Sequence, residues 1–525
     1  MWCSLPINAQ IAPETALPVI PAQKSLLQSA VTDCDSMATL HSANMQEALN
    51  ELYQRRDYVP LWLADATRFT SSRLPALQDE LRQLVDDGLW LADYAGALQA
   101  TPSADTCQEV RLSSYYLMAL EHLSRGRLPQ QLHEEQWQAE TPVANDSSGL
   151  VDLALVNDAH IADAFVAARP SLALYTALRE SYARMDREAA APTQTSIPSG
   201  VTIRAGTSDS RLPQIVARLS SSGYLPADTT LPQTYDATLQ QSVRFFQNDH
   251  GLDTDGIIGP QTLAALNITP EQRLLKVRIN LERLRWISAQ RKDYLLLVNI
   301  AGGRVRLFRG EEIVWESRVQ TGRPARPTPA LISSINRITL NPSWTVPPTI
   351  MKVDVLPQIR KNPDYLREKN LQLLDFQGRS LDPAQQDWNK PTGIMLRQPP
   401  GPTNPLGQVV FRLDNPFAIF LHDTPSQSLF GKSSRSVSSG CVRVERAEEL
   451  ASLLLAGASA EQRALLLSLE ESDETKEIAV PGGPQLILSY WTAEAGEDGK
   501  TLLLQDPYAL DQALMNTFSG IEHAL

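Results

Sequence analysis

The spacing of apolar residues changes near residue 290 of this 525-residue chain, and that change restricts the folds that it can adopt. Before this point apolar residues recur three and four positions apart, which is the spacing of helices buried on one side. Beyond it they alternate with polar residues, as they do in strands. The chain is therefore expected to be an α+β multidomain protein rather than a helical bundle. The helical pattern is seen in Met45–Tyr53, Leu74–Leu84 and Ser113–Leu123, and the alternating pattern in Tyr294–Ile300, Arg304–Arg309 and Ile313–Gln320.

Clusters of small residues and prolines divide the first half of the chain. Residues 25–188 are predicted to form a helical scaffold domain, and residues 189–210, rich in Ala, Ser, Thr and Pro, have the composition of a linker. Residues 211–267 carry Leu239, Val243 and Phe246 at the spacing of one buried helix face, and glycine turns follow. This pattern predicts a small three-helix module.

The second half is expected to form one β-rich domain over residues 290–475. Residues 347–398 interrupt it with a stretch rich in charge and proline that is too long for an ordinary loop. We therefore expect a partly helical capping insertion that moves when a substrate binds, with a rigid decoration as the alternative. Residues 476–525 return to helix and strand and are expected to pack back on the scaffold.

Charge and residue spacing exclude several classes of function. The net charge of −13 disfavours a nucleic-acid-binding protein, because phosphate contact requires a surplus of Lys and Arg. No apolar run approaches the ~18 residues of a membrane span. The seven histidines lack HExxH or paired-ligand spacing and the four cysteines lack CxxC spacing, so we expect neither a metal nor another cofactor.

The first 24 residues do not fit a signal peptide. They contain no basic residue before Lys24, and Pro6, Pro13 and Pro18 interrupt their apolar positions. We expect residues 1–24 to be a leader remnant or a disordered segment.

One stretch carries residues suited to nucleophilic catalysis. A predicted strand, Phe417–Leu421, ends at His422, and a Ser-rich loop then leads to Gly440 and Cys441, 19 residues after the histidine. A strand–loop–strand of this kind can place an imidazole beside a thiol and so generate a thiolate. Gly440 has no Cβ, which lets a substrate carbonyl approach the amides that would stabilise an oxyanion. The alternative is a small core cysteine and an ordinary surface histidine.

The amino-acid sequence of this stretch resembles the catalytic signature of the L,D-transpeptidases (YkuD-type catalytic domain). The matching motifs are His-Asp-Thr-Pro at 422–425 and Ser-Ser-Gly-Cys-Val-Arg-Val at 438–444. Ser439 stands where many members have a second histidine, as is common in the large multidomain subtype, and Phe420 stands where a tyrosine often precedes the Leu-His pair. Thr328-Pro329, residues 341–347 and residues 397–407 also resemble that subtype.

Two further segments carry a resemblance. Residues 211–267 resemble a peptidoglycan-binding domain through Val243–Gln247 and the glycines at 251, 256 and 259, although a generic three-helix unit would share these turns. Residues 53–62 resemble the helical scaffold of the same subtype, so that the likeness covers roughly residues 40–515.

The resemblance implies a peptidoglycan enzyme of the cell envelope or periplasm, with roles in cell-wall biogenesis and cell shape. Cys441 would attack the diamino-acid carbonyl of a tetrapeptide donor, His422 would serve as general base and acid, and an acceptor diamino acid would resolve the thioester into a 3→3 cross-link. Inhibition by carbapenems is expected. An L,D-carboxypeptidase using the same site and a non-catalytic wall-binding protein remain alternatives.

Four of the five accessory residues keep two interpretations each. Asp423 either orients the imidazole or stabilises the turn that follows it. Arg443 and Arg435 either meet a substrate carboxylate or are solvated, Trp344 either lines the cleft or packs in the core, and Ser439 is expected to contact substrate.

An exported enzyme must keep its nucleophile free, so Cys34 and Cys107 are expected to pair if any cysteines are oxidised.

Overall fold

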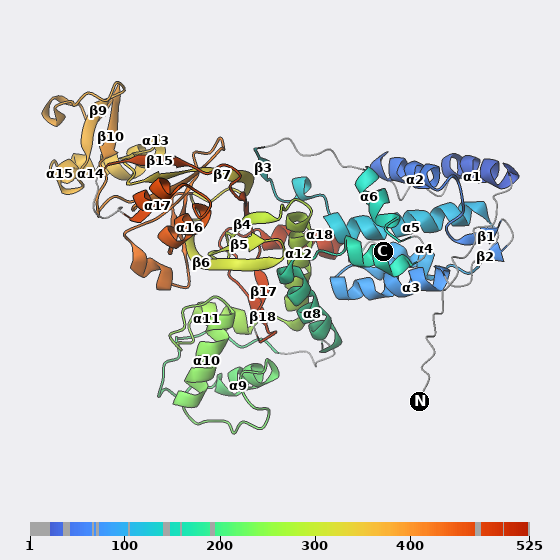
Figure 1. Cartoon of the computed structure of the whole chain (residues 1–525). Coiled ribbons are helices and arrows are strands. Elements are labelled where there is room, and N and C mark those ends of the chain that lie inside the picture. The colour runs from blue at the N-terminus through green and yellow to red at the C-terminus, as the bar shows by residue number, and fades with distance from the viewer. Residues whose placement is uncertain are drawn as a thin grey trace, which may run out of the picture. The chain divides into compact units, whose positions relative to one another are not determined.

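The computed structural model describes residues 21–34, 43–65, 68–69, 73–102, 105–139, 147–157, 160–188, 195–467, 474–496 and 498–522 (Figure 1). These form two compact units. The first comprises residues 1–84, 90–123 and 143–169, and the second residues 85–89, 124–142 and 170–525. Residues 1–20, which include the expected leader and Cys3, lie outside the described part.

The first unit is helical, as the sequence predicts. Its elements are α1 (Pro21–Asp33), α2 (Ala43–Arg55), β1 (Leu63–Asp65), β2 (Arg68–Phe69), α3 (Arg73–Gln83), α4 (Ala95–Leu98), α5 (Thr106–Arg125), α6 (Ser147–Ala154) and α7 (Ile161–Ala168). The buried Glu109 of α5 accepts hydrogen bonds from the backbone amide of Trp62 and from the Tyr53 hydroxyl, at 3.0 and 3.1 Å. Tyr53 and Trp62 begin and end the stretch that resembles the family scaffold, and both contact Ser113. That stretch is therefore a core contact of this unit.

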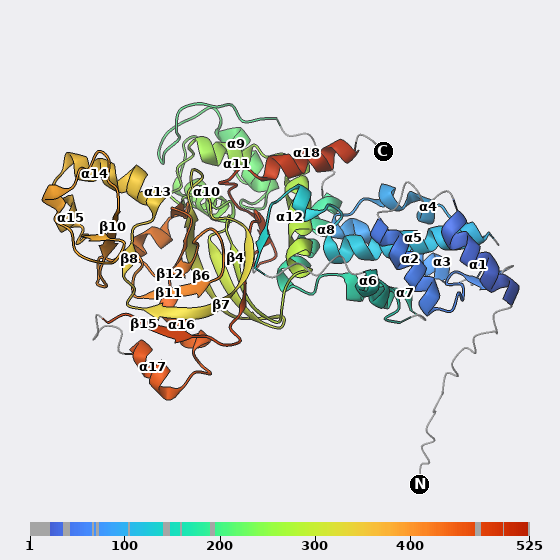
Figure 2. The same ribbon diagram turned by 90° about the horizontal axis from the view of Figure 1, so that it is seen from above.

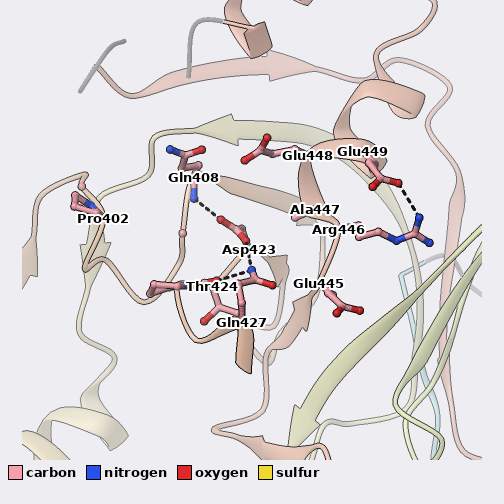
Figure 3. Close-up of a pocket in the computed structure, with 13 residues that line it drawn as sticks. Pro402, Gln408, Asp423, Thr424, Gln427, Glu445, Arg446, Ala447, Glu448 and Glu449 are labelled. Carbon is pink, nitrogen blue, oxygen red and sulfur yellow. Dashed lines mark hydrogen bonds and ion pairs between the residues drawn. The ribbon is translucent and has the colours of Figure 1, made fainter. Parts of the chain in front are cut away.

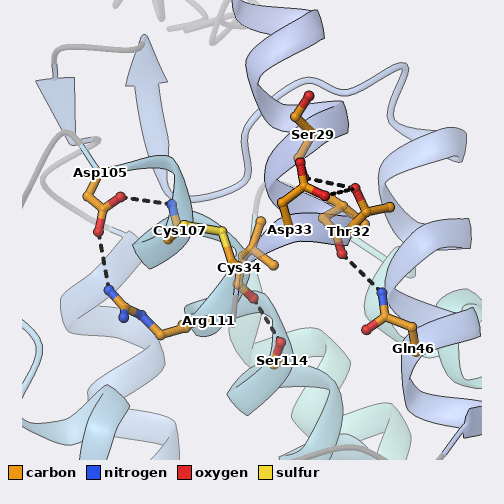
Figure 4. The surroundings of a disulfide bond; sticks show 11 residues. Ser29, Thr32, Asp33, Cys34, Gln46, Asp105, Cys107, Arg111 and Ser114 are labelled. Carbon is orange, nitrogen blue, oxygen red and sulfur yellow. Dashed lines mark hydrogen bonds and ion pairs between the residues drawn. A yellow bond between two sulfur atoms is a disulfide. The ribbon is translucent and has the colours of Figure 1, made fainter. Parts of the chain in front are cut away.

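A disulfide joins Cys34, just after α1, to Cys107 in the first turn of α5 (Figure 4). The bond closes a sequence separation of 73 residues. Cys441 is the free cysteine among the described residues. The predicted pairing is confirmed, and the candidate nucleophile keeps its thiol.

The second unit is built around a sheet that closes on itself (Figure 2). Strands follow the order β11-β12-β14-β6-β5-β4-β16-β7-β15, and β11 also pairs with β7. Leu296, Phe411, Leu421 and Val442 lie in the core that the strands enclose. The strands are β4 (Tyr294–Asn299), β5 (Arg304–Arg309), β6 (Glu312–Gly322), β7 (Leu331–Leu340), β11 (Val409–Leu413), β12 (Leu421–His422), β14 (Val442–Val444), β15 (Lys476–Ala479) and β16 (Gln485–Ser489); β3 (Trp137–Gln138) and β13 (Ser436–Ser438) pair at its sides.

The strand predicted over Phe417–Leu421 is shorter in the structure, where β12 begins at Leu421. The cause is local. The Asn415 side chain accepts hydrogen bonds from the amides of Phe417 and Ile419 and donates one to the Ile419 carbonyl. Ala418 consequently has a positive φ of 55°, which a strand cannot accommodate.

Helices cover the sheet on the side of α12 (Pro270–Ser288). This helix packs against α8 (Ala173–Glu188) and α18 (Asp511–Glu522), and its Arg283 and Arg285 are buried. Arg283 pairs with Glu134 and Asp511, each at 2.6 Å, and these ion pairs offset the cost of burying its charge. The C-terminal segment therefore adds β15 and β16 to this large sheet and packs α18 on α12. Strands β17 (Ala493–Ala495) and β18 (Thr501–Leu503) form a separate pair.

The three-helix module has the predicted form. Its helices are α9 (Leu212–Ser221), α10 (Ala237–Asp249) and α11 (Pro260–Leu266). Ile197 and Ile203, which lie in the segment with linker composition, are buried in the module's core beside Phe246. The module's packed structure therefore begins by residue 197.

The capping insertion is a folded subdomain with its own core. It contains α13 (Pro348–Ile350), a π-helical turn (Met351–Val355), α14 (Leu356–Lys361), α15 (Tyr365–Glu368), and a three-stranded sheet of β8 (Trp344–Thr345), β10 (Ile394–Gln398) and β9 (Gln372–Asp375). Leu356, Ile359, Leu373 and Leu396 are among its buried residues. The predicted partly helical character is confirmed. After the catalytic strands come α16 (Ala447–Leu454) and α17 (Ala460–Leu467).

No helix among the described residues is both long and apolar enough to span a membrane.

Candidate active site

The pairing of β12 with β14 sets the strand that ends at His422 beside the strand that begins directly after Cys441. These strands are parallel, with Leu421 opposite Val442 and His422 opposite Arg443. Leu421 and Val442 point into the core, and because side chains alternate along a strand, His422 and Arg443 point to the other face. Cys441 directly precedes Val442, in the turn that enters β14, and it packs partly buried against the edge of the core. The two predicted catalytic residues therefore lie at the ends of paired strands, and their direct contact stays a prediction.

His422 is held in one tautomer. The residue is 4% exposed, and Nδ1 lies 2.5 Å from the backbone carbonyl of Asp423. Because a carbonyl can only accept, Nδ1 carries the proton and Nε2 carries the lone pair. Burial, reinforced by the charge of Arg443, lowers the pKa of His422 to about 3. The imidazole is therefore neutral near pH 7 and can accept a proton.

Cys441 is poised as a neutral thiol. Burial raises the pKa of the Cys441 thiol above its usual range, while the backbone amide of Phe420 and the charges of Arg443 and Arg412 counteract that rise. Its Sγ lies 3.8 Å from the Ala418 carbonyl. A thiol and an imidazole that are both neutral at rest can exchange a proton when a substrate arrives, rather than forming a standing ion pair.

Arg412 is a site residue that the sequence analysis missed. It lies on β11, its guanidinium sits over the Phe420 ring at 5.0 Å, and its Nε donates to Thr339 Oγ1 at 3.2 Å. Its charge contributes to the lowered pKa of His422 and opposes the rise in the pKa of Cys441. Arg412 stands outside the Cys–His motif, and only strand pairing brings it near. No signal in the sequence marked it.

The turn before Cys441 requires glycine. Gly440 has a φ of +116°, which side chains of L-residues rarely allow, and an added Cβ would lie 3.1 Å from Ile419. Its N–H donates to Ser438 Oγ at 3.1 Å, and its carbonyl accepts from Thr328 Oγ1 at 2.7 Å. The Gly440 amide is thus already engaged in the free protein. For the Cys441 N–H, no acceptor is found among the described residues.

Asp423 divides its two predicted roles between its backbone and its side chain. The backbone carbonyl orients the His422 ring, as described above. The carboxylate turns away and accepts hydrogen bonds from the Gln408 amide and the Gln427 side chain, at 3.0 and 3.3 Å (Figure 3). It also fills the space beside Gly407, where an added Cβ would lie 2.1 Å from it.

A cavity of about 450 Å³ opens beside that carboxylate. Neither Cys441 nor His422 is among the residues that line it, so it is not the space in which the thiol reacts. Its lining is mainly acidic and polar, with Asp423, Gln408, Gln427, Glu445, Arg446, Glu448 and Glu449 among the contributing residues (Figure 3).

The remaining predicted contacts differ in position. Arg443 lies on the catalytic face and donates to Gln320 at 3.1 Å, whereas its buried Nε has no hydrogen-bond partner among the described residues. Ser439 is exposed and accepts a hydrogen bond from Arg326 at 3.1 Å. Arg435 instead anchors a loop, because its guanidinium donates to the carbonyls of Gly302, Gly303 and Lys432.

Trp344 belongs to the cap. It packs, half-buried, against the cap's hydrophobic cluster and sits opposite Gln398 in the cap sheet. Core packing is therefore the role that the structure gives it.

The described residues contain no group of three or more His, Cys, Asp or Glu side chains that could hold a metal ion.

Comparison with known proteins identifies three parts of the chain. Residues 293–461 match the YkuD family, described as the L,D-transpeptidase catalytic domain. Residues 208–266 match a family described as "Putative peptidoglycan binding domain", and residues 47–181 match one described as "Scaffold domain". All three agree with the resemblance seen in the sequence.

A curated relative is the "Putative L,D-transpeptidase" of Haemophilus influenzae, 34% identical over 244 residues. The match covers 46% of this chain and 48% of the relative, so the chain spans about half the length of the curated relative that it matches. Among solved structures, L,D-transpeptidases from Mycobacterium smegmatis and Xylanimonas cellulosilytica are 13% and 15% identical. They cover 38% and 56% of this chain and 58% and 99% of their own, with TM-scores of 0.16 and 0.17, which are too low to establish a common arrangement of whole chains.

The chain therefore contains a YkuD-type L,D-transpeptidase catalytic domain and a peptidoglycan-binding domain.

Proposed function

From this domain content, we propose that the protein is a peptidoglycan L,D-transpeptidase that forms 3→3 cross-links through a thioester on Cys441. The observation that supports the proposal is the pairing of β12, which ends at a neutral His422, with β14, which begins directly after Cys441. A nucleophile and a base held by adjacent strands need no large movement to react.

In the acylation step, His422 Nε2 takes the proton of the Cys441 thiol as Sγ bonds to the carbonyl carbon of the donor's diamino acid. The tetrahedral intermediate then collapses, and the C–N bond to the terminal D-Ala breaks. His422 returns its proton to the leaving amine, which leaves a thioester on Cys441. The bond from Nδ1 to the Asp423 carbonyl fixes the ring throughout and stabilises the imidazolium that forms.

The oxyanion of that intermediate needs amide donors. The Cys441 N–H is the first donor that we assign to it, because the Gly440 N–H is held by Ser438 in the free protein. Gly440 keeps its part as the turn that lets a carbonyl approach. Arg443 is proposed to contact the substrate through its buried Nε, which has no hydrogen-bond partner among the described residues. Ser439 is proposed to contact the substrate because it is exposed and lies two residues before Cys441.

In the second step, the side-chain amine of an acceptor diamino acid attacks the thioester, the C–S bond breaks, and the thiol recovers its proton. Water in place of the amine would make the same site an L,D-carboxypeptidase. The peptidoglycan-binding domain supports the transpeptidase because it would hold the enzyme on polymer that carries both donor and acceptor stems.

We also propose that the protein acts in the periplasm and serves cell-wall biogenesis and cell shape. The wall-directed domains imply a location in the cell envelope. The Cys34–Cys107 disulfide supports an oxidising compartment, since structural disulfides are rare in the cytosol.

The test is incubation of the full chain with disaccharide-tetrapeptide fragments, followed by mass analysis of protein and products. The expected results are a protein adduct on Cys441 lacking the terminal D-Ala, and a cross-linked dimer of fragments. Tripeptide without dimer would identify a carboxypeptidase. No adduct and no product, under conditions in which the protein binds peptidoglycan, would identify a wall-binding protein without catalysis.

A further inference from the structure

Two arginines converge on one carboxylate next to the nucleophile turn. Arg326 Nη1 lies 2.5 Å from Asp354 of the cap, and the same nitrogen donates to Ser439 Oγ at 3.1 Å. Arg323 lies 3.7 Å from the other oxygen of Asp354. Ser439 is two residues from Cys441, so this arginine pair is bound to the turn that carries the thiol.

The arginines are presented by a rigid turn. The Arg326 amide donates to the Arg323 carbonyl at 2.8 Å, and the Arg323 amide donates to the Ser438 carbonyl at 3.0 Å. At the base of the turn, the Tyr508 hydroxyl bridges the Gly322 carbonyl and the Thr328 amide, at 2.6 and 3.0 Å. The backbone of the turn that carries both arginines is therefore held on the catalytic sheet, whereas Asp354 comes from the cap.

Asp354 reaches the arginines from an unusual backbone. It lies in the π-helical turn Met351–Val355, a conformation that is rare and is found often at functional sites. Its side chain is 40% exposed, and Arg323 is 39% exposed, so water can reach this ion pair from outside. An exposed pair such as Arg323–Asp354 contributes little to stability, so fold stabilisation does not explain that contact, whereas the Arg326–Asp354 pair is more buried, with Arg326 14% exposed.

We propose that Arg323 and Arg326 form the site for the terminal carboxylate of the donor stem peptide, and that Asp354 occupies this site until a substrate displaces it. The inference rests on the proposed function. In a tetrapeptide donor the terminal carboxylate lies one residue beyond the scissile carbonyl, so its counter-charge must lie close to the nucleophile turn. Planar guanidinium groups match a carboxylate in geometry as well as charge. Displacement of Asp354 frees the cap from the catalytic sheet, which links donor binding to the cap movement expected from the sequence.

The experiment compares a tetrapeptide donor that has a free C-terminal carboxylate with the same donor carrying a C-terminal amide. Acylation of Cys441 is followed by intact mass in the full-length protein and in R326Q, R323Q and D354N. R367Q serves as the matched control, because Arg367 is an exposed cap arginine paired with Asp364. Hydrogen exchange of residues 351–361 reports release of the cap.

The wild type is expected to acylate at least tenfold faster (kcat/KM) with the acid than with the amide. R326Q and R323Q should lose that preference by slowing the acid alone, and R367Q should keep it. D354N should lower the KM for the acid several-fold and speed exchange in residues 351–361, since it removes a competing carboxylate.

Equal rates for acid and amide in the wild type would overturn the inference, and so would D354N slowing acylation as the arginine variants do. Both outcomes leave a Cys441 thioester and therefore leave the proposed function standing. Failure of the proposed function has a different signature, which is the absence of any adduct with either donor.

Discussion

At the scale of single residues, the site depends on the protonation states of two buried groups. Burial keeps the His422 imidazole neutral and the Cys441 thiol protonated, and the Asp423 carbonyl selects the tautomer whose free nitrogen can act as base. Arg412 and Arg443 bring positive charge that stabilises a thiolate as it forms. The site therefore favours proton transfer during attack over a preformed ion pair.

Substitution of Cys441 and of His422 should have different effects on acylation, because one is the proposed nucleophile and the other the proposed base. C441A is expected to abolish adduct formation with a carbapenem, because no other free cysteine is found among the described residues. H422A should slow the adduct by about 10²–10⁴-fold, the usual contribution of a general base. Intact mass spectrometry measures both, with circular dichroism as the check of folding. Normal labelling of C441A would refute the assignment of the nucleophile.

The pH dependence of acylation should lack the usual histidine step. With its pKa lowered to about 3, His422 stays neutral as the pH falls through 6.5, and the raised pKa of Cys441 keeps the thiol protonated as the pH rises toward 9. The kcat/KM for acylation should therefore stay nearly constant between about pH 5 and 8. A stopped-flow pH series measures it. A midpoint near pH 6.5 would show that His422 titrates normally.

At the scale of elements, short strands and tight turns position the chemistry. Strand β12 has only two residues because the Asn415 loop turns the chain before it, and that loop brings the Ala418 carbonyl to the Cys441 thiol. Far along the chain, the Cys34–Cys107 bond ties α1 to α5 within the helical unit. The elements that position the candidate nucleophile are thus different from the helices that the disulfide joins.

The disulfide should stabilise the helical unit without affecting the nucleophile. The double variant C34S/C107S is expected to lower the free energy of unfolding of that unit by about 2–4 kcal/mol, because the bond restricts a long loop in the unfolded chain. Urea denaturation followed by far-ultraviolet circular dichroism measures this change. Carbapenem labelling of Cys441 in native buffer should match that of the wild type. A loss of labelling would mean that the bond also supports the catalytic domain.

At the scale of the whole molecule, the chain joins a helical unit to a second unit that carries the wall-binding module and the catalytic sheet. The module has a core of its own, to which Ile197, Ile203 and Phe246 contribute. It meets the catalytic domain through Asp253, which accepts a hydrogen bond from Ser433 at 2.7 Å. The proposed function thus assigns binding of polymer and chemistry on the stem peptide to different parts of the chain.

Deletion of the module should separate these two activities. A chain lacking residues 195–267 is expected to lose most of its binding to insoluble peptidoglycan, because the chain then lacks its peptidoglycan-binding domain. Its turnover of a soluble tetrapeptide should fall by no more than a few-fold. Sedimentation with wall material and a product assay measure the two effects, with D253N in the full chain as the control for the Ser433 contact. Equal loss of both activities would indicate that the module mainly supports the catalytic domain.

The sequence by itself determined the parts of the chain and the candidate reacting pair. Periodicity determined the helices of the scaffold and strands β4 to β6, because burial of one face imposes a local spacing. The motif around His422 and Cys441 identified the candidate chemistry, and the predicted cap and module both exist as folded bodies. These features are encoded in short stretches of neighbouring residues.

Only the tertiary structure decided which distant residues complete the site. The nucleophile region is approached by Arg412 from β11, by Arg326 from a turn and by Asp354 from the cap. The two partners of Arg326 lie 28 and 113 residues away from it in the sequence. Arg435 is also an arginine close to the motif in the sequence, yet its guanidinium donates to backbone carbonyls of a loop. Charge alone cannot separate these arginines, because the partner of each is set by strand register and chain crossing rather than by its neighbours in sequence.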